Sequence, residues 1–149
     1  MVLTQKGIDL LHKWEGLRLD AYLCPANVPT IGYGNTYYLD GSRVSIGDTI
    51  TEQQANRLFQ KILERDFIPK VRELVKKVKL TDNQFSALVC FAYNVGIGAF
   101  SKSTLLKKVL LNPNDPEIAN QFRRWNKVKG QVVRGLSNRR EAEIELYNS

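Results

Sequence analysis

The stretch KWEGLRLDAYLCPANVPTIGYGNT, from Lys13 to Thr36, changes from helical to extended patterning within a few residues. Upstream of it, Thr4 is a suitable N-cap and apolar residues recur at helical spacing, which predicts a helix over about residues 5–14. Downstream, β-branched and aromatic residues alternate with glycines, and Asp40-Gly41 is a strong hairpin signal. We therefore predict a helix that leads into a small antiparallel sheet over about residues 28–46.

The rest of the chain has helical patterning. Capping-box patterns begin at Thr51 and Thr81, each ahead of a segment with apolar residues at helical spacing. The second segment is apolar on nearly all sides and predicts a buried central helix, in which Cys90 is a small core residue. Ser103 is a candidate N-cap for the helix that follows. The terminal segment NRREAEIELY could be a strand, but its Arg, Glu, Ala and Leu content favours a helix.

These patterns predict the α+β class with a lysozyme-like division into two lobes. We expect one domain over residues 1–149, with the first helix and the sheet in about 1–50, a larger helical lobe in about 51–149 and a cleft between them. A chain of 149 residues with 43% hydrophobic content has enough material for one core and buries roughly two thirds of its unfolded surface. No run reaches the roughly 18 to 20 apolar residues of a membrane span, and no secretion signal begins the chain, so we expect synthesis in the cytoplasm.

Cysteine and histidine are scarce. Cys24, Cys90 and His12 follow no metal-ligand spacing, which argues against a structural metal site. Two cysteines in a chain without a secretion signal are expected to be free thiols.

The net charge of +7 lies in the second half of the chain. Residues 1–66 hold seven basic and eight acidic side chains, and residues 67–149 hold fifteen basic and seven acidic ones. Such a surface attracts polyanions, namely nucleic acid, anionic lipid or an acidic wall polymer, or has no dedicated partner at all.

Glu15 stands at the end of the first predicted helix, eight residues before Cys24, which is five residues before Thr30. Glycosidic hydrolysis needs a proton donor and, as a rule, a second group that activates water or attacks the sugar. Glu15 is a candidate donor, although an isolated glutamate at a helix end is usually a solvated surface charge.

The pattern Glu15-x8-Cys24-x5-Thr30, followed by Ile31-Gly32-Tyr33-Gly34, resembles the catalytic motif of phage-type lysozymes, the endolysins of glycoside hydrolase family 24. The segments FSALVCFAYNVGIGAFSKSTLL and GLSNRREAEIELY with Trp125 resemble the family's central helix and C-terminal segment. The resemblance implies a muramidase that cleaves the β-1,4 bond between N-acetylmuramic acid and N-acetylglucosamine in peptidoglycan, without metal or organic cofactor.

The resemblance also implies roles for individual residues. Glu15 is the general acid, Cys24 occupies the position of the second carboxylate and Thr30 helps to hold the attacking water. Gly34 and Asn94 are candidate substrate-binding residues, and the Arg139/Arg140 pair has either a role in the cleft or a structural one. Where the family usually has a histidine after the second glycine, this chain has Asn35, for which we expect a structural role. Gly32 and Gly34 are expected mainly to meet the backbone needs of a tight turn.

Three roles remain open for Cys24: a small structural residue, a group that polarises water with Thr30, or a nucleophile. A thiol with a pKa near ~8.5 is mostly protonated at neutral pH. Because a neutral thiol cannot stabilise an oxocarbenium-like transition state as a carboxylate does, a lytic transglycosylase that uses Glu15 alone is an alternative.

A rival from another class is a non-catalytic, basic domain that binds the cell wall or nucleic acid. The stretch FRRWNKVKGQVVRG favours it, but no recognition-helix motif, zinc spacing or RNA-binding signature is present, and no nucleic-acid partner is expected. The enzyme interpretation predicts a monomer that acts on peptidoglycan during host lysis. It also predicts that the chain stays in the host cytoplasm, without stable membrane insertion, until a holin or similar lesion lets it reach the wall.

Overall fold

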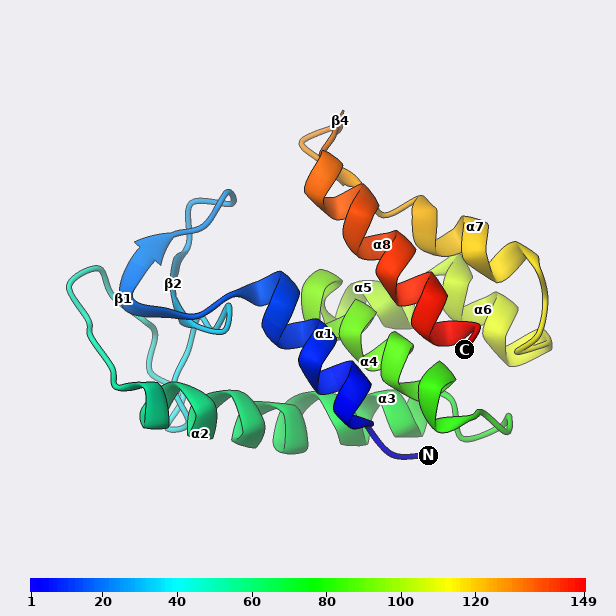
Figure 1. Cartoon of the computed structure of the whole chain (residues 1–149), viewed down its shortest axis with the longest axis horizontal. Coiled ribbons are helices and arrows are strands. Elements are labelled where there is room, and N and C mark those ends of the chain that lie inside the picture. Colours follow the sequence, from blue (N-terminus) through cyan, green and yellow to red (C-terminus); the bar gives the residue numbers. More distant parts are fainter. The chain divides into compact units, whose positions relative to one another are not determined.

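The computed structural model describes residues 1–149 and divides into two compact units, Leu11–Asp66 and Met1–Leu10 together with Phe67–Ser149. The elements follow one another along the chain as shown in Figure 1: α1 (Gln5–Glu15), β1 (Arg18–Leu23), β2 (Pro29–Gly32), α2 (Glu52–Ile62), a π-helical turn (Leu63–Phe67), α3 (Ile68–Leu74), α4 (Asp82–Val95), α5 (Ile97–Ser101), α6 (Thr104–Leu111), α7 (Glu117–Arg123), β3 (Lys127–Val128), β4 (Gln131–Val132) and α8 (Arg134–Tyr147). This is the predicted α+β class. None of the helices has both the length and the apolar character required to cross a membrane.

The sheet of the unit Leu11–Asp66 lies earlier in the sequence than predicted. β1 pairs antiparallel with β2, with Tyr22 opposite Thr30 and an irregular register between Arg18 and Tyr22. The prediction over about residues 28–46 was therefore right for β2 and wrong for most of the remainder. Gly32 and Gly34 have φ angles of 67° and 76°, and this left-handed backbone ends the strand.

The Asp40-Gly41 signal predicted a turn correctly but not a pair of long strands. Gly41 has a φ of 87°, and its N–H donates to the Tyr38 carbonyl at 3.0 Å. A single bridge between Tyr37 and Arg43 flanks the turn. The Asp40 carboxylate accepts from the Ser42 N–H at 2.9 Å, so local side-chain bonding replaces part of the expected ladder.

An aromatic cluster joins the elements of this unit. The His12 ring of α1 stacks on Tyr33 with centroids 4.4 Å apart, and Phe59 of α2 lies 4.8 Å from His12 and 5.1 Å from Tyr33. The Tyr33 hydroxyl also pairs with Asn56 Oδ1 at 3.2 Å. Because α2 packs against β2, the cluster fixes the end of α1 relative to the sheet.

The second unit is built around α4, as the sequence predicted. Thr81 forms a complete capping box with Gln84 at the start of α4, and Thr51 does the same for α2. Residues 84–92 of α4 are all buried, Cys90 among them. α4 packs against α8, and the two helices run side by side in Figure 1. The helical prediction for the terminal segment is thus confirmed.

The hairpin β3–β4 has no counterpart in the sequence predictions. Lys127 pairs with Val132, and Val128 pairs with Gln131. Lys129 and Gly130 have φ angles of 51° and 78°, as in a two-residue turn with left-handed backbone at both positions. The sequence lacks the usual signature of such a turn, because Lys129 stands where asparagine or aspartate is more common.

Candidate active site

The end of α1 places the Glu15 carboxylate. Gly16, with a φ of 67°, follows the helix, and its N–H donates to the His12 carbonyl at 3.0 Å. A glycine in the left-handed conformation is a common helix C-terminus. The chain therefore turns at once into β1, and the half-buried Glu15 side chain stays beside the residues that follow β2.

Gly34 receives the Glu15 carboxylate. A Cβ built on Gly34 would overlap Glu15 Oε1, and Gly34 has a φ of 76°. Gly34 was predicted as a substrate-binding residue, and the geometry adds another requirement, since only glycine lets the carboxylate approach the backbone this closely.

Replacing Gly34 with alanine is expected to displace the Glu15 carboxylate and to lower activity about 10²-fold, the usual cost of a ~1 Å misplacement. Gly41→Ala is the matched control, because Gly41 also has a positive φ of 87° but has no atoms near its would-be Cβ. Both variants carry the ~1–2 kcal/mol cost of left-handed backbone. Thermal melts and cell-wall clearance rates measure the two effects. Equal loss of activity in both variants would show that the contact between Gly34 and Glu15 does not matter for activity.

Cys24 begins the loop that joins β1 to β2, and Thr30 is the second residue of β2. The Cys24 N–H donates to the Val28 carbonyl at 3.1 Å. Thr30, which is almost fully buried, donates its hydroxyl to the same carbonyl at 2.8 Å. The structure thus brings together the cysteine and the threonine of the predicted motif, within the unit that also contains Glu15.

The environment of Cys24 lowers the pKa of its thiol. Burial acts to raise the pKa of the Cys24 thiol, but hydrogen bonds from the backbone of Val28 and Ala26 and from the Thr30 side chain lower it on balance. Hydrogen bonds to the charged form stabilise that form.

Tyr22 and Arg18 join this site, and neither was predicted as a site residue. Burial raises the pKa of the Tyr22 hydroxyl, the charges of Glu15 and Cys24 also raise it, and Arg18 opposes them. The Arg18 guanidinium lies 4.4 Å from the centroid of the Tyr22 ring. Tyr22 is therefore a neutral hydroxyl beside the two predicted catalytic groups. Its place opposite Thr30 depends on a strand pairing that the sequence did not indicate.

Asn35 has the structural role predicted for it. It is 5% exposed and exchanges backbone hydrogen bonds with Ile31 at 2.8 and 2.9 Å. Its Oδ1 accepts from the Tyr33 N–H at 3.3 Å. A Cβ on Gly32 would lie 3.3 Å from this oxygen, so Gly32 also serves the backbone of the turn.

Asn94 and the arginine pair belong to the other unit, and the arginines are structural. Arg139 and Arg140 are 4% and 0% exposed, and both bind the buried carboxylate of Glu143. Asn94 is exposed near the end of α4, and its Oδ1 accepts from Arg140 at 2.7 Å. The bond uses the amide oxygen of Asn94 and not its NH₂ group, which is a hydrogen-bond donor. Substrate binding by Asn94 stays a prediction.

A model of the family described as phage lysozyme matches residues 12–143. The chain belongs to the phage lysozyme family. It is 44% identical to an endolysin of Bacillus phage PZA, of whose length it spans 56%. It is 41% identical to an endolysin of Acyrthosiphon pisum secondary endosymbiont phage 1, with 100% of this chain and 99% of the relative covered. A SAR-endolysin of Bacteriophage PS119 is 37% identical over 89% of this chain and 75% of the relative.

Solved structures place the phage lysozyme fold over the whole chain. An endolysin from Escherichia coli O157:H7 phage FAHEc1 superposes with a TM-score of 0.86 at 39% identity, covering 99% of this chain and 93% of the other. The chain is thus a glycoside hydrolase of the endolysin type, which degrades the peptidoglycan of the host cell wall. The rival of a non-catalytic basic domain is set aside.

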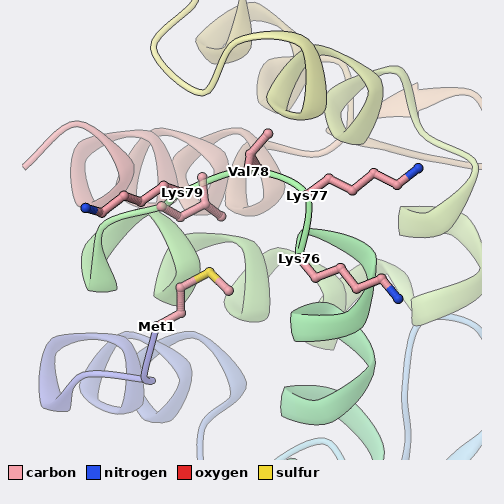
Figure 2. Close-up of a pocket in the computed structure, with 6 residues that line it drawn as sticks. Met1, Lys76, Lys77, Val78 and Lys79 are labelled. Carbon is pink, nitrogen blue, oxygen red and sulfur yellow. The ribbon is translucent and has the colours of Figure 1, made fainter.

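A surface pocket elsewhere in this phage lysozyme lacks catalytic groups. Its volume is about 460 Å³, and its lining residues are Met1, Lys76, Lys77, Val78, Lys79 and Leu80. Figure 2 shows Lys76 and Lys77 pointing one way and Lys79 the other, so their ammonium groups do not converge on one ligand. The pocket lacks the Asp or Glu carboxyl group that glycoside hydrolases use to protonate the leaving oxygen. No cluster of three or more histidine, cysteine or carboxylate side chains is arranged to bind a metal ion.

Proposed function

We propose that this chain hydrolyses the β-1,4 bond between N-acetylmuramic acid and N-acetylglucosamine, with Glu15 as the general acid. The observation that carries the proposal is the approach of the Glu15 carboxylate to Gly34, within the unit that contains Cys24 and Thr30. A carboxyl group held by packing is positioned to protonate the leaving glycosidic oxygen. Replacement of Glu15 by glutamine is the direct test.

Water is the second reactant in the proposed mechanism. The water oxygen bonds to the anomeric carbon as the bond from that carbon to the glycosidic oxygen breaks. One water proton passes to the Cys24 thiolate, and the Glu15 proton passes to the leaving glycosidic oxygen. The Thr30 hydroxyl orients the water, while Tyr22 supplies a neutral donor nearby. The lowered pKa of the Cys24 thiol supports this role over a purely structural one.

The pH dependence of Cys24 variants tests that role. Cys24→Asp is expected to keep activity, whereas Cys24→Ala loses about 10²-fold, the lower range for general-base catalysis. Because the Cys24 pKa is lowered, the thiolate fraction rises with pH below the ordinary thiol value of ~8.5. The rate ratio of wild type to Cys24→Asp should rise over that range, since contributions from Glu15 cancel in the ratio.

Initial clearance rates across the pH range provide the measurement. Equal rates for wild type and Cys24→Ala at every pH would leave only the structural role. A covalent sugar–protein adduct in mass spectra of wild type, absent from Cys24→Ala, would instead assign Cys24 as a nucleophile.

A lytic transglycosylase is the second candidate, favoured by one feature: the motif carries a thiol where a second carboxylate is usual. In that reaction the muramic 6-hydroxyl attacks intramolecularly, so water activation is unnecessary. Digestion of purified sacculi followed by mass spectrometry is expected to yield reducing-end muropeptides. Products lighter by one water, with 1,6-anhydromuramic ends, would establish the transglycosylase.

Access to the wall is a separate proposal. We infer release of a monomer from the host cytoplasm through a holin lesion, as predicted from the sequence. Expression in a bacterial host with and without a co-expressed holin tests it. Lysis without the holin would assign the route to the chain itself.

A further inference from the structure

The hairpin β3–β4 and its flanks combine exposed cations with exposed apolar surface. We call residues 124–134 the basic hairpin. From Ile118 to Arg140 the chain contains no acidic residue. Within the basic hairpin the exposed cations are Arg124, Lys127, Lys129 and Arg134.

Valines stand among these cations. Val132 is 62% exposed and Val133 is 37% exposed. Lys127 lies directly opposite Val132 in the antiparallel pair, so the two side chains share one face of the hairpin. Surfaces that bind at a membrane interface combine lysine or arginine side chains with exposed apolar side chains.

Neighbouring acidic residues do not neutralise the hairpin. Glu141 binds Arg123, which is outside it, with Nε and Oε1 2.7 Å apart. Glu143 is buried against Arg139 and Arg140. The ion pairs of the chain include none of the four exposed cations of the basic hairpin.

The start of α8 adds to the positive field. Val133 is the N-cap of α8 and provides no side-chain hydrogen bond, and the first turn of α8 has no acidic residue. Helix N-termini carry partial positive charge from their free N–H groups. The basic hairpin therefore presents uncompensated positive charge around an exposed valine.

The lysines of the turn after α3, Lys76, Lys77 and Lys79, provide an internal comparison (Figure 2). Lys76 is paired with Glu73, and Leu80 is only 7% exposed. Val78 is half-buried. This turn has three lysines, one of them paired, and lacks the exposed apolar side chain of the basic hairpin.

We propose that the basic hairpin binds the surface of membranes that contain anionic phospholipids. Val132 enters the boundary between headgroups and acyl chains, and Lys127, Lys129 and Arg134 bind lipid phosphates. The proposal concerns adsorption to the surface and does not depend on the catalytic roles above. The positive charge of the hairpin favours an anionic partner. The exposed valine favours a lipid surface over a soluble polyanion, because only the lipid can bury an apolar side chain.

Co-sedimentation with phosphatidylcholine vesicles, with and without phosphatidylglycerol, tests the proposal. Each cation near an anionic surface strengthens binding about fivefold, so the variant K127Q/K129Q/R134Q should bind anionic vesicles about a hundredfold more weakly. Val132→Ser should bind about fivefold more weakly, because burial of the valine is lost. Binding of the wild type should also weaken with added salt.

The variant K76Q/K77Q/K79Q is the matched control, since it removes the same charge from the lysine turn. It should retain nearly wild-type binding, and all variants should digest purified sacculi at the wild-type rate. Equal weakening by both triple variants would overturn the proposal, because overall charge would then explain binding. Unchanged binding by Val132→Ser, together with equally strong binding to inorganic polyphosphate, would overturn it in favour of a polyanion site.

Discussion

Replacing Glu15 with glutamine is expected to lower the rate of cell-wall clearance about 10³-fold, within the range attributed to general acid catalysis. Glutamine has nearly the shape of glutamate but cannot give a proton to the leaving oxygen. Because Glu15 is only half-buried at the end of α1, the substitution should leave the fold intact. Turbidity of chloroform-treated Gram-negative cells, followed with wild type and variant at equal concentration, measures the effect.

Glu64→Gln is the matched control for this experiment. Glu64 belongs to the same compact unit, is exposed, and lies 4.0 Å from Lys61 in a surface ion pair. Its replacement removes one carboxylate without touching the site and should leave clearance unchanged. If Glu15→Gln clears cells as fast as Glu64→Gln while both show wild-type thermal melts, Glu15 is not the general acid.

Replacing Glu143 with glutamine is expected to reduce the free energy of unfolding by about 3–5 kcal/mol, the usual cost of breaking a buried ion pair from one side. Glu143 is fully buried, and its carboxylate lies 3.2 Å from Arg139 Nε and 2.8 Å from Arg140 Nε. Arg140 also lies 4.9 Å from the Phe91 ring centroid. Without the carboxylate, two buried guanidinium groups lose the negative charge that they share.

Glu141→Gln is the control for the buried cluster, since Glu141 is two residues away on the same helix. Its side chain is 54% exposed and pairs with Arg123 on the surface. Exposed pairs contribute little to stability, so the midpoint of denaturant unfolding should hardly move. A midpoint for Glu143→Gln as high as that for Glu141→Gln would show that the buried charges are compensated in another way.

Local signals predicted much of the helical unit. Thr81 and Gln84 form the capping box that their spacing indicated, and Cys90 is a core residue of α4. These features could be predicted because a cap needs residues only three positions apart, and an all-round apolar helix can only be buried.

Pairings between distant residues were harder to predict. The Asp40-Gly41 turn has a strong local signature, and it forms, but the paired strands are β1 and β2. The strand preferences of individual residues do not predict which strands pair, because pairing depends on which segments the rest of the fold brings together. The hairpin β3–β4 was missed for a related reason, since its two-residue strands are too short to show alternation.

The sequence by itself determined the motif of Glu15, Cys24 and Thr30, the capped helices and the buried character of α4, because these depend on residue type and short spacing. Tertiary structure decided that Gly34 must accommodate the Glu15 carboxylate, that Tyr22 stands opposite Thr30, and that Arg139 and Arg140 are buried. Each of those facts depends on segments that meet only after folding. The charge of an arginine does not reveal whether it faces water or a buried carboxylate. Here α8 packs against α4, and Arg140 is buried beside the Glu143 carboxylate.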